Sequence, residues 1–220
     1  MTSSDYSFEL IDPRPTAVAS PYTFFIPSEK QIAAVEVGDC VQLNFKSIPN
    51  DRKHESERMW VDITGRENSR LVGELANKPF DMPQLSLGDQ IIFERYHIMT
   101  IQWGSEVRSN RFREPNKREY WERCMVDKEV VDGVARVGFL YREAPDMTQD
   151  GDKHPDSGWR IRADVSQLND EQYENPEPKY IALGAVLNAD DSWLHLIDSP
   201  ERSRFLLNQE TGEFEKTEEE

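Results

Sequence analysis

Short runs in which apolar and polar residues alternate dominate the first half of the chain. Residues 40–45 place valine, leucine and phenylalanine at every second position, the period that a half-buried strand requires. Further β-rich runs at residues 58–63 and 70–75 are separated by turn-forming Gly and Asn, as in an antiparallel meander. This pattern predicts a β-rich barrel-like domain over residues 22–107.

Local signals mark the ends of several elements in this first half. Ser28 and Gln31 have the spacing of a capping box, so a short helix is predicted to follow Ser28. A Gly-Asp pair precedes the strand at residue 40 and recurs fifty residues later, which predicts two similar strand entries. Residues 1–21 carry three prolines among polar residues, and we expect them to form an extended lead-in.

The pattern changes after residue 107. A run rich in Arg and Glu, interrupted by Pro115, predicts a linker over residues 108–119. Strands are then expected at 124–126 and 137–141, joined as a hairpin, followed by helices near 169–174 and 181–193 and a last hairpin of 204–207 with 213–215. The fold class is therefore α+β, with a small α+β domain over residues 120–216 and a frayed acidic tail over residues 217–220.

Charge narrows the possible functions. The chain has 42 Asp and Glu against 26 Lys and Arg, a formal net charge of −16, which opposes a general nucleic-acid binder. Its longest apolar runs are far too short to cross a membrane, and polar residues rather than a basic, apolar leader follow Met1. With only two cysteines, Cys40 and Cys124, a reducing cytoplasm is the expected location.

No motif for catalysis or for a cofactor stands out. The four histidines lie in separate segments, and neither a phosphate-binding loop nor a nucleophile elbow is present. Residues 150–156 place oxygen donors loosely as in a calcium loop, but the glycine position and the terminal Glu do not fit, so an unmetallated polar loop is the preferred interpretation. We expect no cofactor, no metal and no enzymatic activity.

Acidic residues are densest between residues 143 and 177, where Lys153, Arg160 and Arg162 supply the little opposing charge. Such a face attracts a basic protein partner, or it merely keeps a loop soluble, and composition does not decide between the two. Trp159 lies among these acids; a large indole strongly favours burial, although tryptophan is also a common interface anchor.

Three blocks carry a resemblance to a known family: VGFLYRE at 137–143, DSGWR at 156–160 and LIDSP at 196–200. With these blocks in this order, residues 123–214 resemble the bacterial immunity protein 33-like family. The resemblance implies a small α+β domain of the kind found among immunity proteins of polymorphic toxin systems. Residues 58–89 are similar to an uncharacterised bacterial family of small β-rich domains, which also occurs near toxin and immunity proteins.

These observations predict a non-enzymatic immunity protein that binds and neutralises a basic toxin or effector. A ligand-binding or regulatory module is the alternative. The candidate partner-binding residues come from the family blocks and from the acidic loop, in which Asp152 and Asp156 are expected to be exposed: Glu143, Asp152, Asp156, Trp159, Arg160 and Asp198. Arg160 has a second interpretation, in which it pairs with a carboxylate simply to hold the loops together.

Overall fold

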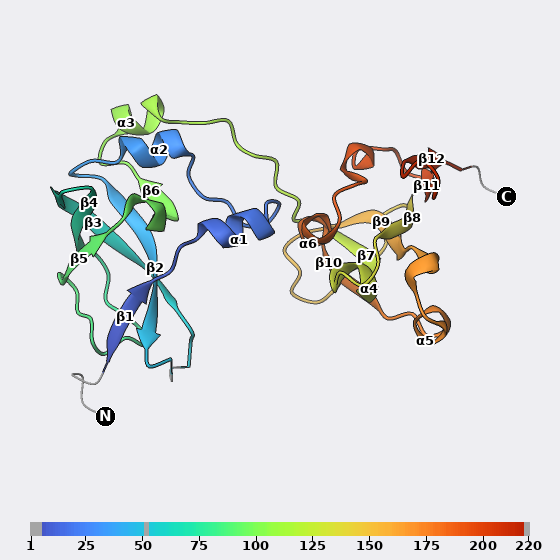
Figure 1. The fold of residues 1–220 in the computed structure, drawn as a ribbon. Coiled ribbons are helices and arrows are strands. Elements are labelled where there is room, and N and C mark those ends of the chain that lie inside the picture. Colours follow the sequence, from blue (N-terminus) through green and yellow to red (C-terminus); the bar gives the residue numbers. More distant parts are fainter. Residues whose placement is uncertain (1–5, 51–52, 218–220) are drawn as a thin grey trace. The chain divides into compact units, whose positions relative to one another are not determined.

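The computed structural model describes residues 6–50 and 53–217, which form two units (Figure 1). The first unit contains the residues up to Ala19 and Phe24–Asn116; the second contains Ser20–Thr23 and the residues from Lys117 onward. Each unit has its own sheet and its own hydrophobic core. The predicted α+β class, a barrel-like β-rich part followed by a small α+β part, is confirmed. Of the predicted acidic tail, residues 218–220 lie outside the described residues.

The first unit is built on an antiparallel sheet that curls into half a barrel. Its strand order is β1-β2-β3-β4-β5. In addition, β6 pairs with the first half of β2, whereas β1 pairs with the second half. Inward-facing side chains of the long strands alternate with outward-facing ones, as the sequence pattern predicted, and form a closed core. The strands are β1 (Ser7–Leu10), β2 (Cys40–Ile48), β3 (Glu57–Glu67), β4 (Arg70–Leu75), β5 (Gln90–Phe93) and β6 (Thr100–Gln102).

The repeated Gly-Asp pair is the same structural device at both strand entries. Gly38 and Gly88 have φ values of +93° and +88°, a conformation that favours glycine. The next residue, Asp39 or Asp89, then accepts a hydrogen bond from the backbone N–H three residues before it, at 3.0 Å and 2.8 Å. The prediction of two similar strand entries is therefore confirmed, at β2 and β5.

The expectation that residues 1–21 lack regular structure is wrong for the described part. Strand β1 extends the sheet by pairing with the second half of β2. Helix α1 (Arg14–Ala19) follows, and it tolerates Pro15 because a proline in the first turn removes an N–H that has no partner within the helix. Pro13 and Pro15 therefore lie at the start of α1 and do not prevent it from forming.

Two further helices belong to the first unit, α2 (Glu29–Ala34) and α3 (Glu106–Arg111), with the short 3-10 helix η2 (Arg95–His97). The predicted capping box of Ser28 and Gln31 is confirmed at the start of α2. Arg108 of α3 donates two hydrogen bonds to the buried carboxylate of Asp39, at 3.0 Å and 2.8 Å. This arginine fastens α3 to the entry of β2.

The second unit has a mixed sheet of order β10-β7-β9-β8-β11-β12, in which β7 and β9 are parallel and every other pair is antiparallel. The predicted last hairpin is confirmed as β11 with β12. The strands are β7 (Arg123–Asp127), β8 (Val137–Arg142), β9 (Asp156–Ala163), β10 (Pro178–Ala182), β11 (Arg204–Leu207) and β12 (Phe214–Lys216).

The predicted hairpin of β7 with β8 is wrong, because β9 lies between the two strands. Helix α4 (Lys128–Val131) follows β7 directly and carries Val130 into the core, so the chain leaves the sheet before it enters β8. Strand β7 is buried at Cys124 and Val126 and takes its two partners, β9 and β10, from later in the chain. The strands β7 and β8 are neighbours in the sequence but are not paired in the sheet.

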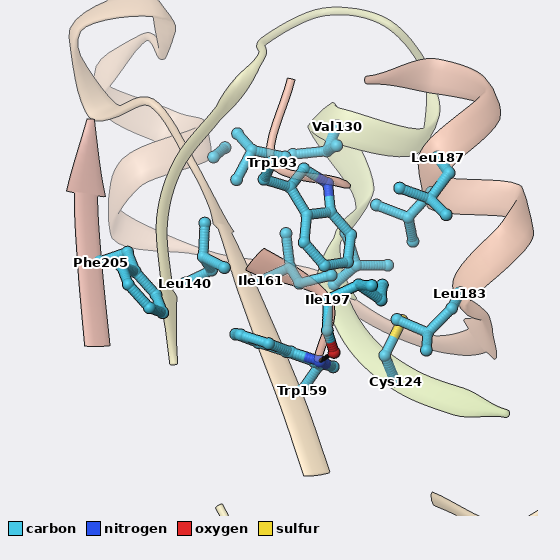
Figure 2. Packing of buried hydrophobic residues seen from close by; sticks show 14 of the residues in the cluster. Cys124, Val130, Leu140, Trp159, Ile161, Leu183, Leu187, Trp193, Ile197 and Phe205 are labelled. Atoms are coloured by element: carbon cyan, nitrogen blue, oxygen red, sulfur yellow. Dashed lines mark hydrogen bonds between the residues drawn. The ribbon is translucent and has the colours of Figure 1, made fainter. Parts of the chain in front are cut away.

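Figure 2 shows the core on one face of this sheet, with Trp159 of β9 and Trp193 at its centre. Both indoles are 0% exposed, which confirms the predicted burial of Trp159, and their rings meet edge to face at 5.6 Å. Helix α6 (Leu183–Ala189) packs Leu183, Val186 and Leu187 against them. Helix α5 (Asp170–Glu174) and the 3-10 helices η3 (Val165–Gln167) and η4 (Leu194–Leu196) complete the unit.

The segment Ser20–Thr23 lies on helix α6. The backbone N–H of Tyr22 donates to Asn188 Oδ1 at 3.0 Å, and its hydroxyl donates to Asp191 at 2.6 Å. That hydroxyl bond is the main reason why the pKa of Tyr22 rises to about 12. Gly184 permits the contact, because a Cβ atom there would lie 2.9 Å from the Tyr22 carbonyl oxygen.

In the described part of the chain, no helix is long and apolar enough to cross a membrane.

Candidate functional site

Three carboxylates surround the guanidinium of Arg160, in the part of β9 that begins at Asp156. Arg160 forms a bidentate ion pair with Asp156, with N–O distances of 3.0 Å and 2.9 Å. It also donates to Glu143 at 3.1 Å and to Asp146 at 2.8 Å. One positive charge therefore faces three negative charges, and this group, here called the Arg160 cluster, keeps an excess of negative charge.

Burial divides the Arg160 cluster into an inner and an outer part. The side chains of Asp156 and Arg160 are only 2% and 8% exposed, whereas those of Glu143 and Asp146 are 50% and 72% exposed. Burial by itself would raise the pKa of Asp156, but the hydrogen bonds from Arg160 and from two backbone N–H groups outweigh it, so that pKa lies below its ordinary value. Asp156 in turn raises the pKa of Arg160. The inner pair is charged at neutral pH, and the outer carboxylates face solvent.

Local sequence explains why the cluster forms at this place. Gly158 has a φ of +79°, and a Cβ atom there would lie 2.1 Å from the Glu143 carbonyl oxygen. Glycine thus lets the end of β8 approach β9, where the Glu143 N–H bonds to the Gly158 carbonyl oxygen at 2.9 Å. Asp156 accepts hydrogen bonds from the N–H groups of Asp146 and Met147, both at 3.2 Å. The buried carboxylate therefore fastens the acidic loop to the sheet.

A groove adjoins the cluster, here called the acidic groove. Asp152 lies in it and accepts from Arg123 at 2.7 Å through Oδ1, while its Oδ2 is buried and lacks a hydrogen-bond partner among the described residues. Tyr180 of β10 closes the groove with its hydroxyl donating to the Met147 carbonyl oxygen at 3.1 Å. The lining residues are Pro145, Asp146, Met147, Thr148, Gln149, Asp152, Lys153, His154, Pro155, Asp156 and Tyr180.

The structure brings together some of the candidate residues and separates others. Glu143, Asp156 and Arg160 share the Arg160 cluster, and Asp152 lies in the adjoining groove. Trp159 is on the opposite face of β9, in the core. Asp198 is exposed and forms an ion pair with Arg118 at 2.6 Å; it does not line the groove.

The expectation that Asp152 and Asp156 are exposed is wrong. Their side chains are 11% and 2% exposed, because Arg123 and Arg160 respectively hold them against the sheet. A charge reversal at either position would bury two like charges together and would disrupt the fold rather than a surface. The structural interpretation of Arg160, as a residue that holds the loops, accounts for its inner ion pair.

Arg142 is the residue that sequence reasoning missed. It donates to the Ser157 carbonyl oxygen at 3.0 Å and to the Ser199 carbonyl oxygen at 2.7 Å, and its guanidinium lies 5.7 Å from the centre of the Trp159 ring. Trp159 itself donates to the Ile197 carbonyl oxygen at 3.2 Å. The three family blocks therefore meet around Arg142. The only available signal was an arginine inside an otherwise apolar strand block.

Candidates for chemistry other than binding are sparse. Burial raises the pKa of both thiols, to about 12 for Cys40, so neither Cys40 nor Cys124 is an activated nucleophile. Among residues 6–50 and 53–217, no group of three or more His, Cys, Asp or Glu side chains is placed to hold a metal ion. In the 150–156 loop, arginines hold the carboxylates of Asp152 and Asp156. The charged groups that this arrangement presents to solvent are the carboxylates of Glu143 and Asp146.

Comparisons with known families agree with the division into two units. Residues 124–218 match the family described as "Immunity protein Imm33 domain", and residues 22–108 match "Uncharacterized protein conserved in bacteria (DUF2314)". The chain thus carries an Imm33 immunity domain at its C-terminal end and a DUF2314 domain before it, which confirms both resemblances. No curated protein and no solved structure matches the chain.

Proposed function

We propose that this protein is a bacterial immunity protein that neutralises a toxin by binding it in the cytoplasm, without catalysis. The match of residues 124–218 to an immunity domain is the observation that carries the proposal. An immunity protein acts on a cognate toxin, and the second unit provides a charged groove beside a rigid sheet on which such a partner can dock.

We further propose that the toxin surface is basic and meets the acidic groove. The exposed Glu143 and Asp146 are the contact residues, since the single guanidinium of Arg160 leaves the cluster with excess negative charge. Asp152 lines the groove with a largely buried carboxylate that Arg123 holds, and Asp156 and Arg160 hold the loop in position. Trp159 supports the site from the core, and Asp198, paired with Arg118, is assigned to the edge of the interface. Complementary charge of this kind mainly raises the association rate.

The experiment uses the purified full chain and a candidate toxin, defined as any toxin domain that a gene adjacent to that of this chain encodes. We expect toxin activity to fall in proportion to the amount of chain added and to vanish at a fixed molar ratio, with a complex that elutes as one species in size-exclusion chromatography. Inactivation of the toxin by much less than one molar equivalent of the chain, with the toxin cleaved or modified, would show that the protein acts by catalysis rather than by binding. No inactivation and no complex would contradict the immunity proposal itself.

A further inference from the structure

The face of the second sheet opposite its core carries aromatic and other apolar side chains. The helices that cover the sheet, α4 and α6, send their apolar residues into the core on the other face. Strand alternation therefore turns the neighbours of each core residue outward: Leu140 lies between outward Phe139 and Tyr141, and Phe205 between outward Arg204 and Leu206.

Strand register aligns these outward residues into a continuous surface. Tyr141 is paired across the strands with Arg160 on one side and Arg204 on the other, and Arg160 is paired with Met125. In the next row, Phe139 lies between Arg162 and Leu206. The outward residues Met125, Phe139, Tyr141, Arg204 and Leu206 are called here the aromatic face.

The aromatic face is preorganised and partly exposed: Leu206 is exposed, and its other members are half-buried. The rings of Phe139 and Tyr141 lie 5.5 Å apart, and the Arg204 guanidinium lies 5.9 Å from the centre of the Tyr141 ring. Leu206 is 51% exposed, a large fraction for a leucine in the middle of a strand. Tyrosine, arginine, phenylalanine and methionine are the residues enriched in protein interfaces, and rigid aromatic side chains lose little entropy on binding.

The aromatic face is continuous with the acidic groove. Arg160 links the two: it is paired with Tyr141 in the sheet and binds Asp146 and Asp156, which line the groove. Tyr180, which closes the groove, is paired with Met125. An apolar surface therefore borders a rim with excess negative charge, which fits a partner whose apolar contact residues are flanked by Lys or Arg.

We infer that the aromatic face is the surface on which the basic toxin docks, with Phe139, Tyr141 and Leu206 as its apolar contacts. This inference rests on the proposed function and adds the part of the interface that provides affinity. A second copy of this chain is the less favourable occupant, because two chains of net charge −16 repel each other and each would bring an acidic rim to the other.

The test measures binding of the toxin domain encoded beside the gene to full-length variants. Tyr141→Ala and Leu206→Ser are expected to weaken binding by roughly tenfold or more, mainly through faster dissociation. Tyr173→Ala and Val134→Ser are the matched controls, because these side chains are 65% and 53% exposed elsewhere on the same unit. The controls are expected to bind as the wild type does.

Hydrogen exchange of the wild-type complex gives an answer that does not depend on variant folding. Protection of the β8 and β11 amides on toxin binding is the expected result. Wild-type affinity in Tyr141→Ala and Leu206→Ser, or protection confined to other segments, would overturn the inference while the immunity proposal stands. A wild-type chain that binds no toxin would overturn both. A dimer of the free chain that Tyr141→Ala dissociates would assign the face to self-association instead.

Discussion

Arg160 has two roles that are separated by burial. Its bidentate pair with Asp156 lies inside the protein, and its contacts with Glu143 and Asp146 lie at the surface. The inner pair fixes the loop, because the same Asp156 carboxylate also accepts from two loop N–H groups. Breaking a buried pair by removing one partner leaves an uncompensated charge, whereas an exposed pair contributes little to stability.

Replacement of Asp156 should therefore destabilise the second unit strongly. We expect Asp156→Asn to lower the free energy of unfolding by about 3 kcal/mol, since the Arg160 guanidinium loses its buried partner. Urea unfolding, with hydrogen exchange of the β9 amides to report on the second unit, measures the change. Asp150→Asn, an exposed acid of the same loop, is the control and should unfold as the wild type does. Equal loss in both variants would contradict the special role of Asp156.

The same carboxylate should contribute to the pH dependence of stability. The pKa of Asp156 is lower in the folded protein than its ordinary value, so its stabilisation is complete above the unfolded pKa of about 4 and is lost as pH falls through the folded pKa. We expect the difference in stability between wild type and Asp156→Asn to be constant from pH 7 to about pH 5 and to shrink below about pH 4. Urea titrations at fixed ionic strength measure it; a difference that stays constant into strong acid would contradict this account.

Sequence reasoning at the residue level identified the right chemical types but not their exposure. It singled out Glu143, Asp156 and Arg160, which the structure joins in one cluster. It treated Asp156 as a surface acid, because composition gives no sign that an arginine four residues later on the same strand will bury it. Burial of a charge depends on a partner's position, which a local pattern does not contain.

Elements differ in how well local pattern predicts them. Strand β2 alternates strictly and was predicted, because one of its faces is buried and the other is not. Strand β9 was missed, since nearly all of its positions are buried and no alternation is visible in its sequence. Pairing was less predictable still: β9 enters between β7 and β8, and no local signal for that long-range choice exists.

Helix α6 provides a test of packing at the element scale. Gly184 allows Ser20–Thr23 to lie on the helix, and an added methyl group would meet the Tyr22 carbonyl oxygen at 2.9 Å and a Thr23 methyl at 2.9 Å. We expect Gly184→Ala to speed hydrogen exchange of the Tyr22 N–H by roughly tenfold or more, as its bond to Asn188 weakens.

The control for this change is Gly65→Ala in β3, where the nearest atom to an added Cβ lies 4.0 Å away. This variant should leave exchange at Tyr22 unaltered. Wild-type exchange at Tyr22 in Gly184→Ala would show that the helix shifts to accept the methyl group and that the close approach is not required.

At the scale of the whole molecule, the position of negative charge on the surface, rather than the net charge, governs encounter with a basic partner. We expect Glu143→Gln/Asp146→Asn to slow toxin association several-fold at low salt and to reduce the salt dependence of the association rate. Glu171→Gln/Glu174→Gln on α5 removes the same charge from exposed positions away from the groove and is the control. Stopped-flow association at several ionic strengths measures both. Equal slowing would assign the effect to total charge rather than to the groove.

The most direct test of the central claim is protection of cells that express the toxin encoded beside the gene. The wild-type chain and Glu171→Lys/Glu174→Lys should restore growth, whereas Glu143→Lys/Asp146→Lys, whose reversed charges repel a basic toxin at the groove, should not. Equal amounts of folded chain are verified for each variant. Full protection by Glu143→Lys/Asp146→Lys would contradict toxin binding at the acidic groove, and failure of the wild-type chain to protect would contradict the immunity function.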